Sequence, residues 1–88
     1  MILKPGFELV EIADEYMAIP VGEKSNTFGG LVALSDAAYF LLKNLDRQQT
    51  KESLIDLLMG EYDVDYSVAK KDLETLIPKL IELGLIEE

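Results

Sequence analysis

The stretch from Asp65 to Ile86 carries the longest helical signal in the chain. Asp65 is suited to cap the start of a helix, and Gly84 suits the left-handed residue that follows a helix end. Apolar residues recur at helical spacing along one arc, with polar residues opposite. The arc consists of Ala69, Leu73, Leu76, Ile77, Leu80 and Ile81. The stretch therefore predicts a long amphipathic helix whose apolar face needs a partner.

Pro78 lies inside this predicted helix. Proline lacks the N–H that would bond to the carbonyl of Glu74, and its ring clashes with the preceding turn. We expect a kink between these two residues. The bend either wraps the helix around the core or changes the shape of a cleft beside it.

Two further helices are indicated upstream. Ser35 is placed to cap a helix from Asp36 to Lys43, which is largely apolar and therefore expected at the centre of the fold. After a polar break at residues 44–49, Thr50 caps an amphipathic helix that extends to the region of Tyr62. The second half of the chain is therefore predicted to be helical.

The first half carries strand signals instead. Phe7 to Ile12 and Tyr16 to Val21 are rich in β-branched and aromatic residues, and the short segment 13–15 between them suits a hairpin. The apolar phase shifts between Leu9 and Val10, which predicts a bulge or a local twist. We expect two antiparallel strands here.

In the second strand, alternation predicts that Met17, Ile19 and Val21 face the core, with Tyr16 and Ala18 on the opposite face. Pairing should end or bulge near the following proline, Pro20, because proline cannot donate a hydrogen bond to the ladder. The prediction fixes which face of the hairpin the helices cover.

Gly22 to Gly30 is the one long polar segment with several glycines, and it is predicted to be a flexible connector. Its Lys24-Ser25 pair lacks the earlier glycine and the following helix of a phosphate-binding loop. Leu31 to Leu34 then predicts a third strand that is apolar on both faces. Either helices cover both faces, or the strand forms part of a binding groove.

Three strands followed by three helices indicate an α+β fold, specifically a winged helix-turn-helix-like domain with a three-stranded antiparallel sheet followed by three helices. The 88 residues, of which 49% are hydrophobic, suit a single domain over residues 1–88. No run of residues is apolar enough to span a membrane or serve as a signal peptide, so we expect a cytoplasmic protein.

The composition argues against most chemistry. Without cysteine or histidine, the chain lacks thiolate and imidazole metal ligands and the commonest general acid or base. Asp63 and Asp65 form the densest acidic pair, which capping of the following helix explains. We therefore expect no enzyme activity, no metal and no cofactor. The net charge of −9 also argues against nucleic acid as a partner.

The chain resembles a known family. The residues that carry the resemblance occur in order between about residues 7 and 87: Leu34-Ser35-x-x-Ala38, Asp46, Thr50-x-x-x-Leu54-Ile55, Tyr62-Asp63, Val68-x-x-x-Asp72-Leu73-x-x-Leu76-x-x-x-Leu80 and Gly84-Leu85-Ile86-Glu87. This pattern is similar to the PqqD-like proteins, also called RiPP recognition elements. Arg47, where the family often has glycine, and Pro78 depart from it.

The resemblance implies a function. Members of this family bind the leader segment of a ribosomally made precursor peptide and present it to a modifying enzyme, often a radical-SAM maturase, without doing chemistry themselves. The leader adds as an antiparallel strand to the third strand, in a cleft beside the third helix. The residues thereby implied here are Leu31, Val32, Ala33 and Leu34 on the strand, and Lys70, Leu73, Glu74 and Ile77 on the helix.

Other interpretations stay open at this point. Leu73 is also explained as an ordinary core residue and Lys70 as a solvated surface charge. A winged-helix transcriptional regulator shares the architecture, although the region from Asp65 to Leu83 is net negative, unlike a DNA-recognition helix. A general protein–protein interaction module is a further alternative. A free strand edge could also pair with a second copy of the chain and give a homodimer.

Overall fold

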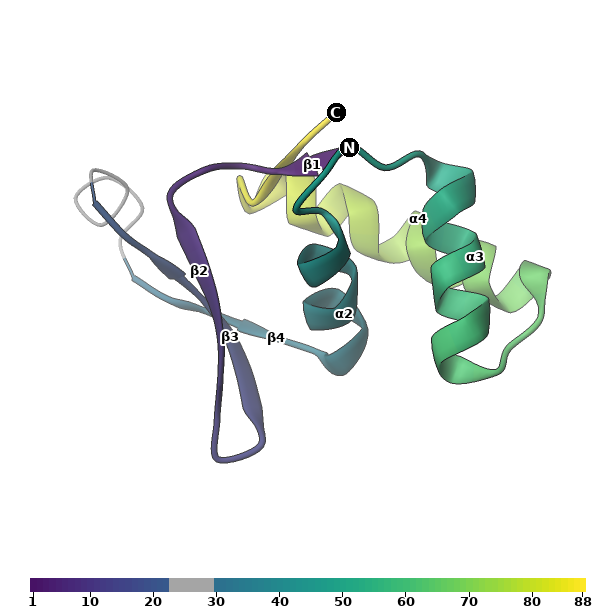
Figure 1. The fold of residues 1–88 in the computed structure, drawn as a ribbon, viewed down its shortest axis with the longest axis horizontal. Coiled ribbons are helices and arrows are strands. Elements are labelled where there is room, and N and C mark those ends of the chain that lie inside the picture. The colour runs from purple at the N-terminus through teal and green to yellow at the C-terminus, as the bar shows by residue number, and fades with distance from the viewer. Residues whose placement is uncertain (23–29) are drawn as a thin grey trace.

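A three-stranded antiparallel sheet lies beside three helices in the computed structural model, which describes residues 1–22 and 30–88 (Figure 1). The sheet has the order β2-β3-β4, from β2 (Phe7–Ile12), β3 (Glu15–Pro20) and β4 (Val32–Leu34). The predicted α+β fold is confirmed. Most of the predicted connector, including Lys24-Ser25, lies outside the described residues.

The three helices are α2 (Asp36–Asn44), α3 (Lys51–Tyr62) and α4 (Tyr66–Glu82). Their predicted N-caps are confirmed. The Ser35 hydroxyl accepts a hydrogen bond from the Ala38 N–H, and Thr50 forms a reciprocal capping box with Ser53. These local contacts satisfy amide groups that a helix start leaves free.

Helix α4 also begins and ends as its sequence predicts. The Asp65 carboxylate accepts a 3.0 Å hydrogen bond from the Val68 N–H. Gly84 has φ of 79°, and two backbone bonds close the helix end, from the Gly84 N–H to the Ile81 carbonyl and from the Leu85 N–H to the Leu80 carbonyl. This is a Schellman motif. The helix continues through Pro78, and the predicted kink stays a prediction.

The hairpin of β2 and β3 is tighter and more regular than expected. Its turn has two residues, Ala13 and Asp14, with φ of 52° and 66°. Such left-handed pairs match the twist of the flanking strands. The register is continuous from the Phe7–Pro20 pair to the Ile12–Glu15 pair, so of the predicted bulge or local twist the bulge is wrong. The local twist stays a prediction. The ladder does end at Pro20, as predicted.

The predicted facing of β3 is also wrong. Ala18 is fully buried and Tyr16 stacks on Tyr39 of α2, whereas Val21 is exposed. The small Ala18 side chain lies on the face that the helices cover, and the larger Met17 and Ile19 lie on the other face. Hydrophobicity alone favoured the bulkier set, but contact with the helices decides the phase.

A second, two-stranded sheet joins the two chain ends and was not predicted. β1 (Ile2–Leu3) pairs with β5 (Ile86–Glu87), and Figure 1 shows the N- and C-termini side by side there. The Leu3 N–H also donates to the Leu45 carbonyl, at 2.9 Å. The ends are therefore part of the folded structure.

The core lies where the three helices and this terminal sheet meet. Its largest fully buried side chains come from every helix, from the residue after α2 and from the C-terminal segment: Leu41, Leu42, Leu45, Leu54, Ile55, Leu73, Leu85 and Ile86. No polar or charged residue in the described ranges is buried. Among the same residues, no helix is long and apolar enough to cross a bilayer.

Candidate functional site

Strand β4 forms one edge of the three-stranded sheet. It pairs with β3 on one side, and within residues 1–22 and 30–88 no strand pairs with its other side. Leu31, just before the strand, is 58% exposed, and Ala33 is exposed too. Val32 and Leu34 pack partly against the core. An exposed edge carries backbone N–H and C=O groups that an added strand can bond.

A hollow of about 330 Å³ adjoins this strand, and we call it the strand hollow. Leu31, Ala33 and Leu34 line it together with Asp14, Glu15, Tyr16, Met17, Ser35 and Asp36. Apolar side chains from β3 and β4 therefore lie beside three carboxylates. Such a surface suits an extended peptide that carries apolar and basic side chains.

A different hollow, of about 360 Å³, lies on α4 beside the chain ends, and we call it the terminal hollow. It is lined by Met1, Lys51, Leu73, Glu74, Ile77, Pro78 and Glu88. Two of these lining residues form an ion pair, in which Nζ of Lys51 lies 2.8 Å from Oε2 of Glu74. The hydrogen bond between them lowers the pKa of Glu74 and raises that of Lys51.

The structure separates the two halves of the predicted site. Leu31, Ala33 and Leu34 line the strand hollow, whereas Leu73, Glu74 and Ile77 line the terminal hollow. Lys70 and Val32 line neither; Lys70 is exposed, and its positive charge also lowers the pKa of Glu74. Leu73 is fully buried, which supports its interpretation as a core residue.

Several residues of these hollows were missed from the sequence. Met1 and Glu88 reach the terminal hollow because β1 pairs with β5, and strands of two residues are too short to show periodicity. Lys51 and Glu74 are 23 residues apart on different helices, so no local pattern links them. Only the packing of α3 on α4 brings them together.

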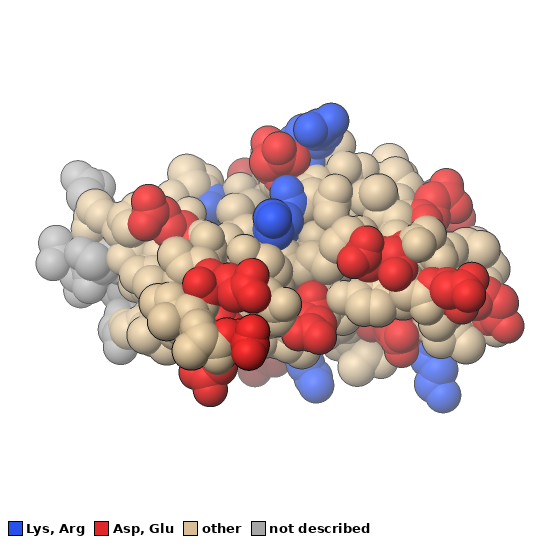
Figure 2. Space-filling view, turned by 60° about the horizontal axis from the view of Figure 1, so that its bottom comes forward, with Lys and Arg blue, Asp and Glu red and all other residues tan. Residues whose placement is uncertain are grey.

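Acidic residues are more widespread than basic ones on the face shown in Figure 2, where red patches lie scattered among the tan residues. Seventeen Asp and Glu against eight Lys and Arg account for this excess. The described residues contain no cluster of three His, Cys, Asp or Glu arranged to hold a metal ion. The charge of this surface favours a basic partner.

The sequence that builds these elements matches a known family along most of the chain. The family profile for Coenzyme PQQ synthesis protein D (PqqD) matches residues 10–86. The protein is a member of the PqqD family. This confirms the resemblance that the sequence motifs indicated, and the open strand β4 is thus the third strand of a PqqD-family sheet.

Two solved structures share this PqqD-family fold. "TbiB1 in Complex with the TbiA(beta) Leader Peptide" is 22% identical, with a TM-score of 0.76 over 99% of this chain and 95% of that one. "Lasso peptide synthetase B1 complexed with the leader peptide" is 20% identical, with a TM-score of 0.73 over 98% and 95%. No curated protein sequence matches the chain. At these identities the structures establish the common fold.

Proposed function

We propose that this PqqD-family protein binds the leader segment of a ribosomally made precursor peptide and presents the precursor to a modifying enzyme, such as a radical-SAM maturase. The leader adds as an antiparallel strand to the open edge of β4, beside the strand hollow. The edge at Leu31 to Leu34, where Leu31 and Ala33 are exposed and which no strand of residues 1–22 and 30–88 pairs, is the observation that carries the proposal. Both similar structures are described as complexes with leader peptides.

Strand addition suits this edge for a physical reason. The backbone bonds of an added strand supply affinity for any sequence, and pockets for alternate side chains supply selectivity. Leu31 and Ala33 are exposed on one face of the strand and alternate with Val32 and Leu34, which pack partly against the core. The strand hollow then receives side chains from one face of the leader.

The same proposal makes the protein a binding module rather than a catalyst, working in the cytoplasm where precursor peptides are made. A winged-helix DNA regulator is disfavoured because nucleic-acid affinity depends on Lys and Arg that neutralise phosphates. Asp65 to Leu83, which includes the helix that such a regulator would use, carries three lysines against four carboxylates.

An NMR titration tests the proposal. Synthetic leader peptides from precursor genes beside this gene are added to the ¹⁵N-labelled protein. We expect the largest amide shifts at Leu31 to Leu34. The proposal fails if no such leader binds, or if the shifts lie elsewhere. Light scattering at the same concentrations distinguishes a leader complex from self-pairing of β4 in a homodimer.

The helix half of the site stays a prediction. Lys70, Leu73, Glu74 and Ile77 lie on or beside the terminal hollow, away from the strand hollow. The same titration tests them separately. Amide shifts in the turns from Lys70 to Ile77 are expected if α4 forms the second wall of the leader site, and shifts confined to β4 would remove these residues from it.

A further inference from the structure

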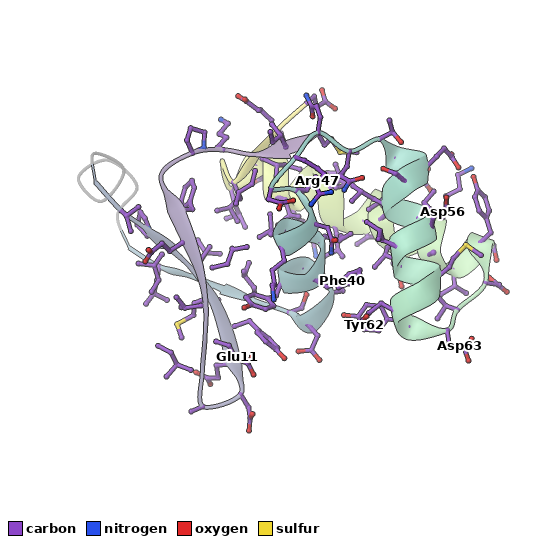
Figure 3. All side chains as sticks on the ribbon, in the orientation of Figure 1. Glu11, Phe40, Arg47, Asp56, Tyr62 and Asp63 are labelled. Atoms are coloured by element: carbon purple, nitrogen blue, oxygen red, sulfur yellow. The ribbon has the colours of Figure 1, made fainter. Side chains whose placement is uncertain are left out.

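A third hollow, of about 280 Å³, lies between the hairpin, α2 and the end of α3, and we call it the aromatic hollow. It is lined by Glu11, Tyr16, Asp36, Tyr39, Phe40, Lys43, Glu61 and Tyr62. Figure 3 shows Phe40 of α2 close to Tyr62 at the end of α3, with Glu11 projecting from the hairpin. Four aromatic rings and four charged groups therefore converge from four elements, β2, β3, α2 and α3.

The four rings form two contacting pairs. Tyr16 and Tyr39 stack with centroids 4.4 Å apart and an interplanar angle of 27°. Phe40 and Tyr62 meet edge to face at 5.9 Å and 83°. The faces of aromatic rings carry negative electrostatic potential and attract cations. One cation already uses this property, because the Lys43 ammonium lies 5.4 Å from the centre of the Tyr39 ring.

The carboxylates of the hollow are not neutralised. Glu11, Asp36 and Glu61 face the single cation Lys43, so three negative charges against one positive leave a net charge of −2. The ion pairs of the described residues are Arg47–Asp46 and Lys51–Glu74, and neither involves these carboxylates.

Two tyrosines of the hollow, Tyr16 and Tyr62, respond to this negative field. The charges of Glu11 and then Asp36 raise the pKa of Tyr16. Burial raises the pKa of Tyr62 first, and the charges of Asp36 and Glu61 add to it. The Asp36 carboxylate thus acts on both tyrosines, one from each ring pair. The same negative charges would attract a cation placed in the hollow.

We propose that the aromatic hollow binds an arginine side chain of the precursor leader, located just N-terminal to the residues that pair with β4. This inference rests on the proposed function. Tyr16 and Asp36 line both the strand hollow and the aromatic hollow, so the two adjoin. An antiparallel strand on β4 begins opposite Leu34, and Leu34 is two residues from Asp36.

Arginine fits the hollow better than lysine does. Its planar guanidinium stacks on aromatic faces and donates several hydrogen bonds in a fixed fork, which suits rings flanked by carboxylates. It is also more weakly hydrated than an ammonium, so moving it against four rings costs less. The hollow therefore selects leaders with arginine at this position.

A small-molecule titration tests the hollow without any leader. Nα-acetyl-arginine amide is added to the protein, and the ring protons of Tyr16, Tyr39, Phe40 and Tyr62 are followed by NMR. Nα-acetyl-citrulline amide, which has nearly the same shape but no charge, is the matched control. We expect saturable shifts of these rings with arginine only. Equal shifts with citrulline, or shifts spread over the whole acidic surface, overturn the proposal.

A charge-neutralising variant separates the hollow from general attraction to an acidic protein. We expect Glu61→Gln to weaken binding of the arginine probe at least three-fold. Glu82→Gln removes the same charge from an exposed position on α4 that lines none of the three hollows, and it should leave the affinity unchanged. Equal weakening by both variants contradicts a specific site.

A leader that shifts β4 allows the final test. The arginine that lies N-terminal to the paired segment of this leader is replaced by citrulline. The replacement should weaken binding of the leader to the wild-type protein about five-fold. It should not change the affinity of the leader for the Glu61→Gln variant. If the replacement has no effect on the wild type, the hollow proposal fails while strand addition stands. If no leader affects β4, the proposed function fails, and with it the leader as the source of the arginine.

Discussion

Leu31 and Ile12 form a matched pair for testing the binding edge. They are 58% and 57% exposed, but Leu31 precedes β4 and Ile12 ends β2. We expect Leu31→Ser to weaken leader binding about ten-fold, equivalent to ~1.4 kcal/mol, because a partly buried leucine contact is lost. Ile12→Ser should leave the affinity unchanged. Isothermal titration calorimetry measures both, and equal losses would assign the leader to another surface.

Gly60 lies inside α3, where a Cβ would meet no atom within 4 Å. Alanine is favoured over glycine in a helix interior by about 0.8–1 kcal/mol, so Gly60→Ala should raise the free energy of unfolding by roughly that amount. Gly84→Ala should instead lower the free energy of unfolding, because φ at Gly84 is 79°. A residue with a side chain is strained in this conformation. Urea denaturation measures both, and stabilisation by Gly84→Ala would contradict the assigned helix end.

At the scale of a helix, the Asp65 cap makes the stability of α4 depend on pH. The Val68 N–H and the Ser67 hydroxyl hydrogen-bond to the Asp65 carboxylate and lower its pKa. A lowered pKa in the folded state stabilises the fold above the ordinary aspartate value of about 3.9, and this contribution is lost as the pH falls through the lowered value.

Asp65→Asn keeps a capping side chain but does not titrate. The difference in urea midpoint between the wild type and Asp65→Asn should therefore shrink as the pH falls from 6 toward 2. Asp65→Ala, which removes the cap, should be less stable than Asp65→Asn at both ends of this range. A difference that does not change with pH would show that the cap leaves the carboxyl pKa unaltered.

Elements were predictable where local chemistry determines them. The caps at Asp65 and Gly84 depend on residues within one turn, and the sequence was sufficient to locate both ends of α4. The facing of β3 was not predictable, because contact of Ala18 and Tyr16 with the helices decides it and alternation of bulk does not. The strand half of the predicted site, Leu31 to Leu34, was implied by the family resemblance. That this strand lies at the edge of the sheet could be learned only from the strand order in the structure.

At the scale of the whole molecule, the terminal sheet closes the core. Ile86 in β5 is 1% exposed, so Ile86→Ala should lower the free energy of unfolding by about 2–5 kcal/mol. A domain of this size has roughly 5–10 kcal/mol in total, so the variant loses a large share of its stability. Ile81→Ala, at a 39% exposed position on α4, is the control and should cost far less. Similar urea midpoints for the two variants would mean that the terminal sheet frays.

This closure was beyond sequence analysis for a physical reason. Each terminal strand has only two residues, which is too short to show alternation of apolar and polar residues. The two strands also lie at opposite ends of the sequence, so no local pattern links them. The Lys51–Glu74 contact and the convergence of Glu11, Phe40 and Tyr62 likewise depend on how distant elements pack. Fold class and family were thus readable from the sequence, whereas the three hollows were not.

The pairing of β1 with β5 also determines how the protein can be joined to others. Because both chain ends leave the fold at the same small sheet, a linker attached to either end starts next to the terminal hollow. Neither end contributes a residue to the strand hollow. A reporter, or an enzyme made as a genetic fusion at either end, would therefore be tethered beside the terminal hollow while β4 stays open to a peptide.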